Sequence, residues 1–211
     1  MSRAKYQLKN GQVVPGVTTV INLLAKPALI EWAWKCGVDG IDYHKVRDDA
    51  ADIGELAHKL IHCYIQKTEP DLKDYSETEI EKATKCLNLF KDWFKIDEFE
   101  ILASEKPMVS EGYQFGGTPD IVAKRQGEIW LIDLKTGNAI YEEHWLQVAA
   151  YELLWEENGG DTIDIRCILR LAKDGSKVED HFLLYRDEYN ERIFLHLLGI
   201  YQLQFNKKYG G

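Results

Sequence analysis

The hydrophobic residues of this chain follow two different spacings, and each spacing predicts its own kind of element. In residues 44–67 and 77–95 they recur every three or four positions, which is typical of helices that bury one face. Two further helical patterns cover 142–157 and 187–207. Between these helices, short runs of β-branched and aliphatic residues predict strands at 99–109, 121–122, 129–134, 163–171 and 178–185. This order predicts an α/β fold in which helices flank a small central mixed β-sheet.

Turn residues organise the first 40 positions. Asn10-Gly11 tolerates positive φ and predicts a hairpin over residues 5–15. Thr18 or Thr19 can cap a short helix, which Pro27 ends before a second helix follows. The N-terminal part of the chain is therefore expected to be largely helical.

The two long helices carry their own local signals. Ser76 with Glu79 forms the pattern of a capping box at the start of the second one. Gly54 lies in the middle of the first, where a glycine costs close to 1 kcal/mol relative to alanine. We therefore expect a neighbouring backbone to approach the helix closely at Gly54.

Length and composition are those of one globular unit. A chain of 211 residues can bury a sizeable core, and we expect a single domain over 1–211, with a mostly helical part (1–97), a sheet core with one helix (98–185) and a C-terminal helix (186–211). No apolar run approaches the roughly 18 residues of a membrane span, and residues 1–10 lack the layout of a signal peptide. We expect a cytoplasmic, intracellular protein, of cellular or viral origin.

The net charge of −9 is not typical of a protein that binds nucleic acid. Its distribution is uneven, because residues 1–48 hold seven Lys and Arg against four acids, which gives +3 and leaves −12 for the rest. A basic N-terminal part could guide the phosphate backbone of a nucleic acid. The alternative explanation of the same charge distribution is that these charges are scattered over the solvated surface.

Two carboxylates interrupt apolar runs in the middle of the chain. Asp120 precedes Ile121-Val122, and Asp133 lies inside the run 129–134, with a turn at 126–128 between them. Strands disfavour aspartate, and two such charges on adjacent strands repel each other unless a cation lies between them. Strand alternation puts Lys135 on the same face as Asp133. The pattern predicts a hydrolytic site with a divalent metal.

The same residues resemble the signature of the PD-(D/E)XK nuclease superfamily. The resemblance covers about residues 12–170 and includes features of the RecB-type exonuclease branch, to which mitochondrial single-strand exonucleases and CRISPR-associated nucleases also belong. It is carried by Pro119-Asp120, Asp133-Leu134-Lys135, Thr136-Gly137, Gln147 and Tyr151. It implies a restriction-endonuclease-like core.

The resemblance also implies roles for individual residues. The implied metal ligands are His58, Glu105, Asp120, Asp133 and the backbone carbonyl of Leu134. His62 and Glu111 are the alternatives to His58 and Glu105, each of which also has an ordinary structural explanation. The implied catalytic residues are Asp120, Asp133, Lys135, Gln147 and Tyr151.

Candidate contacts to the substrate follow from the same resemblance. They are Thr18, Trp32, Thr118, Thr136, Gln147 and Tyr151. For Thr18 and Trp32 the other interpretation is a helix cap and a core tryptophan. Gln147 and Tyr151 lie one helical turn apart and could be a structural pair.

The implied activity is that of a metal-dependent DNA exonuclease that acts on single strands or DNA ends in replication, recombination or repair. Alternatives are a structure-specific or restriction-type endonuclease and a nuclease-like DNA-binding subunit that needs a partner. Carboxylates favour one or two Mg²⁺ or Mn²⁺ ions, and the histidine favours Mn²⁺. An iron–sulfur cluster is not expected, because of the four cysteines only Cys167 is late in the chain. No P-loop motif is present, so no bound nucleotide is expected and any ATP-driven step lies in another protein. A helicase or a recombination protein is a conceivable partner.

Overall fold

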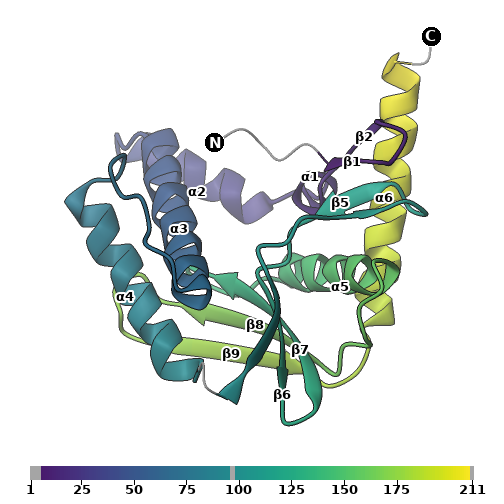
Figure 1. Cartoon of the computed structure of the whole chain (residues 1–211). Coiled ribbons are helices and arrows are strands. Elements are labelled where there is room, and N and C mark those ends of the chain that lie inside the picture. The colour runs from purple at the N-terminus through teal and green to yellow at the C-terminus, as the bar shows by residue number, and fades with distance from the viewer. Residues whose placement is uncertain (1–5, 96–97, 210–211) are drawn as a thin grey trace.

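The computed structural model describes residues 6–95 and 98–209 and centres on a five-stranded sheet. Its strands lie in the order β3-β6-β7-β8-β9 (Figure 1). Their bounds are β3 Glu100–Ser104, β6 Ile121–Arg125, β7 Glu128–Lys135, β8 Ile165–Leu171 and β9 Val178–Leu183. Neighbours are antiparallel except β7 and β8, which run parallel and are connected through helix α5 (Glu142–Glu157). A parallel pair needs such a crossover, and the mixed sheet flanked by helices is confirmed.

Two hydrophobic layers hold the helices against the sheet. Helices α3 (Tyr43–Gln66) and α4 (Glu77–Trp93) pack on one side, and α5 packs on the other with α1 (Val17–Ile21) and α6 (Glu188–Tyr209) (Figure 1). Strand β7 serves both layers, because its alternate side chains point to opposite faces. Leu131 belongs to the α5 layer, whereas Ile132 and Leu134 belong to the α3–α4 layer. By the same alternation, Asp133 and Lys135 lie on the α5 side.

The N-terminal segment begins with the expected hairpin, formed by β1 (Tyr6–Gln7) and β2 (Val13–Val14). The predicted second helix is α2 (Pro27–Val38), which starts at the proline itself. The predicted threonine cap of α1 is wrong, because Gly16 is the N-cap and no side chain caps the helix. Thr18 and Thr19 lie inside its first turn instead.

Two other local predictions are confirmed. The capping box starts α4, since the Glu79 carboxylate accepts from the Ser76 amide (2.6 Å) and the Ser76 hydroxyl accepts from the Glu79 amide (3.4 Å). Gln126 and Gly127 make the turn between β6 and β7, with φ of 52° and 93°. This turn fixes the register of the two strands that carry the central carboxylates.

The predicted continuous strand over 99–109 is wrong. Strand β3 ends at Ser104, and β4 (Met108–Ser110) belongs to a separate two-stranded sheet with β5 (Phe115–Gly117). The break falls at Glu105, whose φ of 49° lies in the left-handed region that a strand cannot contain. The chain therefore changes direction at Glu105, which is one of the predicted metal ligands.

A buried ion pair fixes α5 on the sheet. Glu152 of α5 accepts two hydrogen bonds from the Arg166 guanidinium of β8, one of them of 2.9 Å, and each residue is only 2% exposed. Removing one partner of such a pair leaves an uncompensated buried charge, which typically costs about 3–5 kcal/mol. The pair therefore holds α5, and the polar residues on it, in one place above β7 and β8.

The state of the cysteines and the character of the helices complete the description of the fold. All four cysteines are free, with Cys63 half-buried and Cys36, Cys86 and Cys167 buried. Among residues 6–95 and 98–209, no helix combines the length and the apolar character needed to cross a bilayer.

Candidate active site

Asp120 and Asp133 face each other across neighbouring strands. Asp120 is the residue before β6, and Asp133 lies near the end of β7. In the β6–β7 register Ile121 pairs with Ile132, so the next position outward places Asp120 opposite Asp133. Side chains of directly opposed residues project to the same face with Cβ atoms about 5 Å apart. The register thus places the two carboxylates at neighbouring positions on the same face of the sheet.

Three ligand-type groups meet beside this pair. His58 Nδ1 lies 3.1 Å from Asp120 Oδ1 and 3.7 Å from Glu105 Oε1. One ligand atom from each of the three residues fits within 4.8 Å of the others. Their side chains are 27%, 33% and 11% exposed for His58, Glu105 and Asp120, so solvent reaches the group. An imidazole and carboxylate oxygens in this arrangement are suitable ligands for Mn²⁺ or Mg²⁺.

The left-handed turn at Glu105 brings that carboxylate into the group. The Glu105 amide donates to the Asp120 backbone oxygen at 2.9 Å, which ties the end of β3 to the start of β6. A non-glycine residue with positive φ is held there by its surroundings at some energetic cost. Here the conformation is fixed by the same two segments that supply the carboxylates.

Asp120 is held on both of its oxygens. Oδ2 accepts a 2.7 Å hydrogen bond from the Leu134 amide, while Oδ1 faces His58. Burial by itself raises the pKa of Asp120, but His58, Lys135 and the Leu134 amide outweigh it and keep the pKa below its usual value. The carboxylate is therefore ionised and oriented before any ligand arrives.

His58 occupies the position between two negative charges. Partial burial opposes a charge on the imidazole, yet Asp120 and Glu105 together raise the pKa of His58 to about 10. Without a metal the ring is thus an imidazolium ion, and its proton balances the carboxylates. A metal ligand must be the neutral imidazole, so binding of a cation here would release that proton.

Asp133 is the residue whose surroundings most clearly fit a cation ligand. It is fully buried, and neither of its oxygens has a hydrogen-bond donor within the described structure. Lys135 Nζ lies 2.5 Å from Oδ2 as an ion pair without hydrogen-bond geometry. Burial raises the pKa of Asp133 to about 6, because Lys135 offsets the desolvation only in part and Asp120 adds repulsion. Burial of a carboxylate whose charge is offset only in part is costly, and a divalent ion shared with Asp120 would reduce that cost.

Lys135 starts a chain of polar contacts that continues onto α5. Its Nζ donates to Gln147 Oε1 at 3.1 Å, and Gln147 Nε2 donates to the Tyr151 hydroxyl at 2.8 Å. Burial, with added repulsion from Asp120 and Asp133, raises the pKa of Tyr151 well above its usual value. The tyrosine therefore keeps its proton, and the lysine amine is held between Asp133 and Gln147.

The rival residues lie outside this group. His62 Nδ1 is 2.8 Å from the Ser104 hydroxyl, and Glu111 accepts from the Lys9 amide at 2.9 Å. Both thus have local structural partners. Between the alternatives left open by the sequence, the structure brings together His58 and Glu105.

An open cleft of about 590 Å³ gives access to the group. Its wall includes Gly54, Thr136 and Lys173 beside His58, Glu105 and Asp120. A Cβ on Gly54 would lie 2.9 Å from Thr136 Oγ1, so the predicted close approach exists, although a side chain and not a backbone makes it. Lys173 is not among the residues predicted from the sequence, because it lies in the β8–β9 turn with no local signal of function.

The remaining candidate substrate contacts are scattered. The Thr118 hydroxyl lies 3.0 Å from the Tyr6 hydroxyl of the N-terminal hairpin. Thr18 is exposed on α1, and Trp32 is half-buried on α2 with its ring edge-on to Tyr43. Neither Thr18 nor Trp32 lines the cleft. The Leu134 side chain packs in the core and its amide binds Asp120, so only its carbonyl is left for the predicted metal contact.

Comparison of the sequence with known protein families gives one match. The family model described as the PD-(D/E)XK nuclease superfamily matches residues 38–194, and no curated protein matches the chain. Among solved structures, a "Putative exonuclease" from Eubacterium rectale is 12% identical over 75% of this chain and 68% of its own, with a TM-score of 0.49.

Two other solved structures are similar at lower scores. LHK-Exo, solved in complex with dAMP, is 13% identical over 76% of this chain and 90% of its own, with a TM-score of 0.39. SSO0001 is 16% identical over 58% of this chain and 59% of its own, also at 0.39, so this chain spans less than two thirds of that protein. The family match covers well over half of the sequence, and the chain belongs to the PD-(D/E)XK nuclease superfamily.

Proposed function

We propose that this protein is a deoxyribonuclease that hydrolyses phosphodiester bonds with a divalent metal, Mg²⁺ or Mn²⁺, in the cleft between α3 and the end of β7. The observation that carries the proposal is the fully buried Asp133 carboxylate, whose ion pair with Lys135 offsets its desolvation only in part, together with the ligand-type group of His58, Glu105 and Asp120. The residues that would hold the metal are His58, Glu105, Asp120 and Asp133, with the Leu134 carbonyl as a further ligand.

The metal and the lysine address different parts of the reaction. When bound, a divalent cation neutralises phosphate charge and lowers the pKa of water, which makes attack on a phosphodiester feasible at neutral pH. Lys135 places a positive amine beside the same position, where it stabilises the negative charge that develops on the phosphoryl oxygens. Gln147 and Tyr151 position that amine through their hydrogen bonds. Asp120 and Asp133 keep the ligand set anionic and oriented.

The proposed substrate is DNA that has a free end. The enzyme would act either on single strands or at the ends of a duplex. The resemblance to the RecB-type exonuclease branch supports this choice, and the open cleft admits a polymer. A role in replication, recombination or repair follows from the same choice. We also propose that 1–211 acts as one nuclease domain, since Tyr6 of the N-terminal hairpin contacts Thr118 next to the central carboxylates.

A digestion experiment tests the proposal. End-labelled linear single- and double-stranded DNA and a circular single strand are incubated with Mg²⁺, Mn²⁺ or chelator. We expect short products from linear DNA with either metal, none in chelator, an intact circle, and no products from Asp120→Asn under any condition. Undiminished cleavage in chelator or by Asp120→Asn would overturn the metal mechanism. Cleavage of the circle would replace the exonuclease assignment by an endonuclease.

A further inference from the structure

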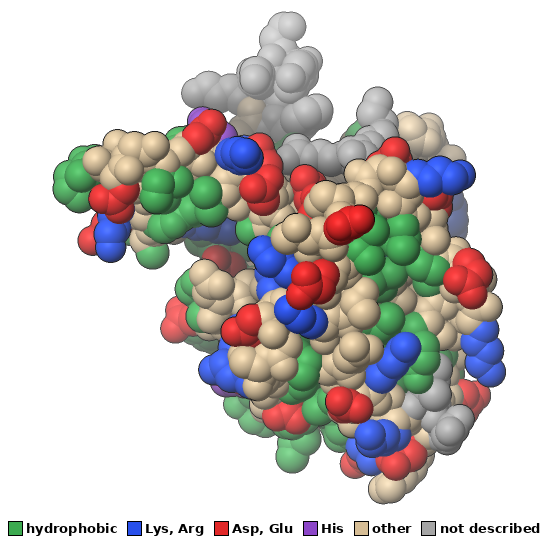
Figure 2. All heavy atoms as spheres, turned by 90° about the vertical axis from the view of Figure 1, so that its left-hand side faces the viewer, with side chains coloured by type: hydrophobic (Ala, Val, Ile, Leu, Met, Phe, Trp, Pro, Cys, Tyr) green, Lys and Arg blue, Asp and Glu red, His purple; other side chains and the backbone are tan. Residues whose placement is uncertain are grey.

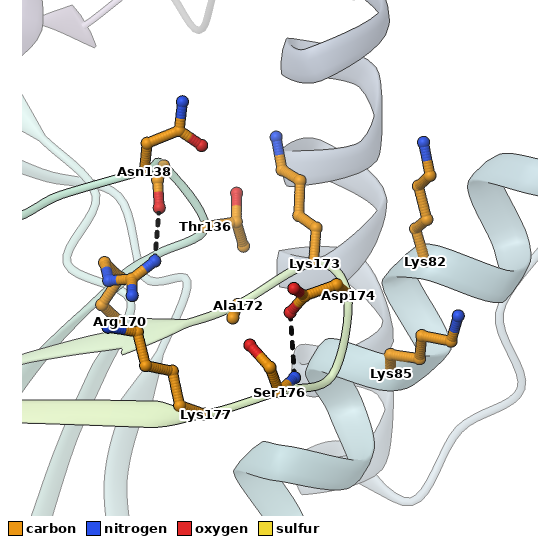
Figure 3. A pocket seen from close by; sticks show the side chains of 11 residues that line it. Lys82, Lys85, Thr136, Asn138, Arg170, Ala172, Lys173, Asp174, Ser176 and Lys177 are labelled. Carbon is orange, nitrogen blue, oxygen red and sulfur yellow. Dashed lines mark hydrogen bonds between the residues drawn. The ribbon is translucent and has the colours of Figure 1, made fainter.

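A second cavity, of about 470 Å³, lies between α4 and the β8–β9 turn (Figure 3). The charged side chains in its wall are Lys82 and Lys85 of α4, Arg170 of β8, and Lys173, Asp174 and Lys177 around the turn. Five of these six are basic, in a chain whose net charge is −9. Figure 2 shows the side of the molecule that lies on the left in Figure 1, where acidic and basic side chains are interspersed over the surface. The cavity concentrates positive charge where the chain as a whole is acidic.

Part of this charge has no carboxylate partner. Lys85 pairs with Glu81 at 2.7 Å, and Arg170 and Lys177 share Glu179. Within the described residues, no carboxylate pairs with Lys82 or Lys173. Lys173 Nζ donates instead to the Ala50 backbone oxygen of α3 at 2.7 Å. In Figure 3 the amines of Lys82 and Lys173 extend in the same direction from two different elements.

The cavity adjoins the active-site cleft. Thr136, Gly137 and Lys173 line both spaces, and Thr136 directly follows Lys135 in the chain. Arg170 Nη1 donates to the Gly137 oxygen at 3.0 Å, which fixes the shared wall. If one phosphate of a DNA strand lies at Lys135, the phosphates of the neighbouring nucleotides would therefore lie near these basic groups.

The chemistry of the wall selects the part of the polymer that would bind. None of the side chains that line the cavity is aromatic, so the cavity has no surface on which a base can stack. Lysine and arginine beside hydroxyl groups are instead the usual contacts to phosphate oxygens. We propose that this cavity binds the phosphate backbone of the substrate strand next to the scissile bond, without reading its sequence.

This inference rests on the proposed function, and a binding experiment separates the two. Anisotropy of a labelled single strand of 20 nucleotides is measured in Ca²⁺, over a range of salt concentrations, so that no cleavage is needed. For Lys82→Gln/Lys173→Gln we expect binding to weaken roughly 10-fold at 0.1 M salt, with a salt slope lower by about 1.4, since each lost phosphate contact on single strands contributes about 0.7. Strands of different sequence should lose affinity equally.

Lys124→Gln is the matched control, because Lys124 is exposed on β6 and lies outside both cavities. It should bind with the wild-type affinity and slope, and thermal melting should show that all variants are folded. Single Lys82→Gln provides a second, milder variant with about half the change in slope. Wild-type affinity and slope in the double variant, or no binding by the wild type, would overturn the phosphate site. Weaker binding by the double variant, with a wild type that fails to cleave in Mg²⁺ or Mn²⁺, would leave the phosphate site intact and refute the nuclease activity instead.

Discussion

Lys135→Met lowers the cleavage rate roughly 10²- to 10³-fold while Mn²⁺ still binds. Methionine keeps the length of the side chain but removes the amine that lies between Asp133 and Gln147. Loss of one preorganised group that stabilises developing charge costs about this much in other enzymes. The metal ligands are unchanged, so the expected loss is in the rate at saturating metal and DNA. Single-turnover kinetics and a calorimetric Mn²⁺ titration measure the two quantities separately.

Lys124→Met is the matched control for this substitution, because Lys124 is exposed and distant in the register from the site. It should cleave at the wild-type rate. A Lys135→Met protein that cleaves within about threefold of wild type would contradict the role given to the lysine. A protein that no longer binds Mn²⁺ would instead make Lys135 a residue that organises the metal site.

Asp133→Asn abolishes cleavage and yet stabilises the metal-free protein above pH 6. In the folded chain the pKa of Asp133 is raised to about 6, mainly by burial, against an ordinary value of 3.8. The unfolded chain therefore ionises this carboxyl first, and wild-type stability falls as the pH rises from about 4 to about 6. A shift of about two units corresponds to roughly 3 kcal/mol at most. Asparagine does not ionise, so it avoids this cost.

Thermal melting in chelator, at pH 4 and at pH 8, measures the effect. We expect equal melting temperatures at pH 4 and a melting temperature several degrees higher for Asp133→Asn at pH 8. Saturating Mn²⁺ at pH 8 should reverse the order, because a ligand that binds only the native wild type stabilises it by mass action. An Asp133→Asn protein that is less stable than wild type in chelator at pH 8 would show that the ion pair with Lys135 outweighs the cost of burying the carboxylate.

Most of the sheet and its helices follow from local sequence patterns. The alternation around Asp133 and Lys135 predicts that both lie on one side of β7, and their ion pair confirms it. The periodicity of 44–67 predicts α3 almost to its ends, because a long amphipathic stripe has few alternative structures. The prediction of one continuous strand over 99–109 is wrong because the break at Glu105 does not depend on local sequence. A left-handed glutamate at Glu105 is imposed by tertiary contacts with Asp120, which no local pattern contains.

The site itself is predictable only in part. His58 and Asp120 are 62 positions apart, and periodicity gives no reason to bring them together. The family resemblance selects them over His62 and Glu111, and the structure brings them together with Glu105. Lys82 and Lys173 carry no motif, because their shared cavity is created by packing of α4 beside the β8–β9 turn. Such surfaces depend on tertiary structure.

The most direct measurement is the anomalous scattering of crystals soaked with Mn²⁺. One or two strong peaks are expected within about 2.5 Å of carboxylate oxygens of both Asp120 and Asp133, with His58 Nδ1 or Nε2 as a further ligand, and they should be lost in Asp120→Asn crystals. Peaks only at other sites, or an ion that touches Asp120 but leaves Asp133 with Lys135 alone, would contradict the shared cation on which the proposed chemistry depends.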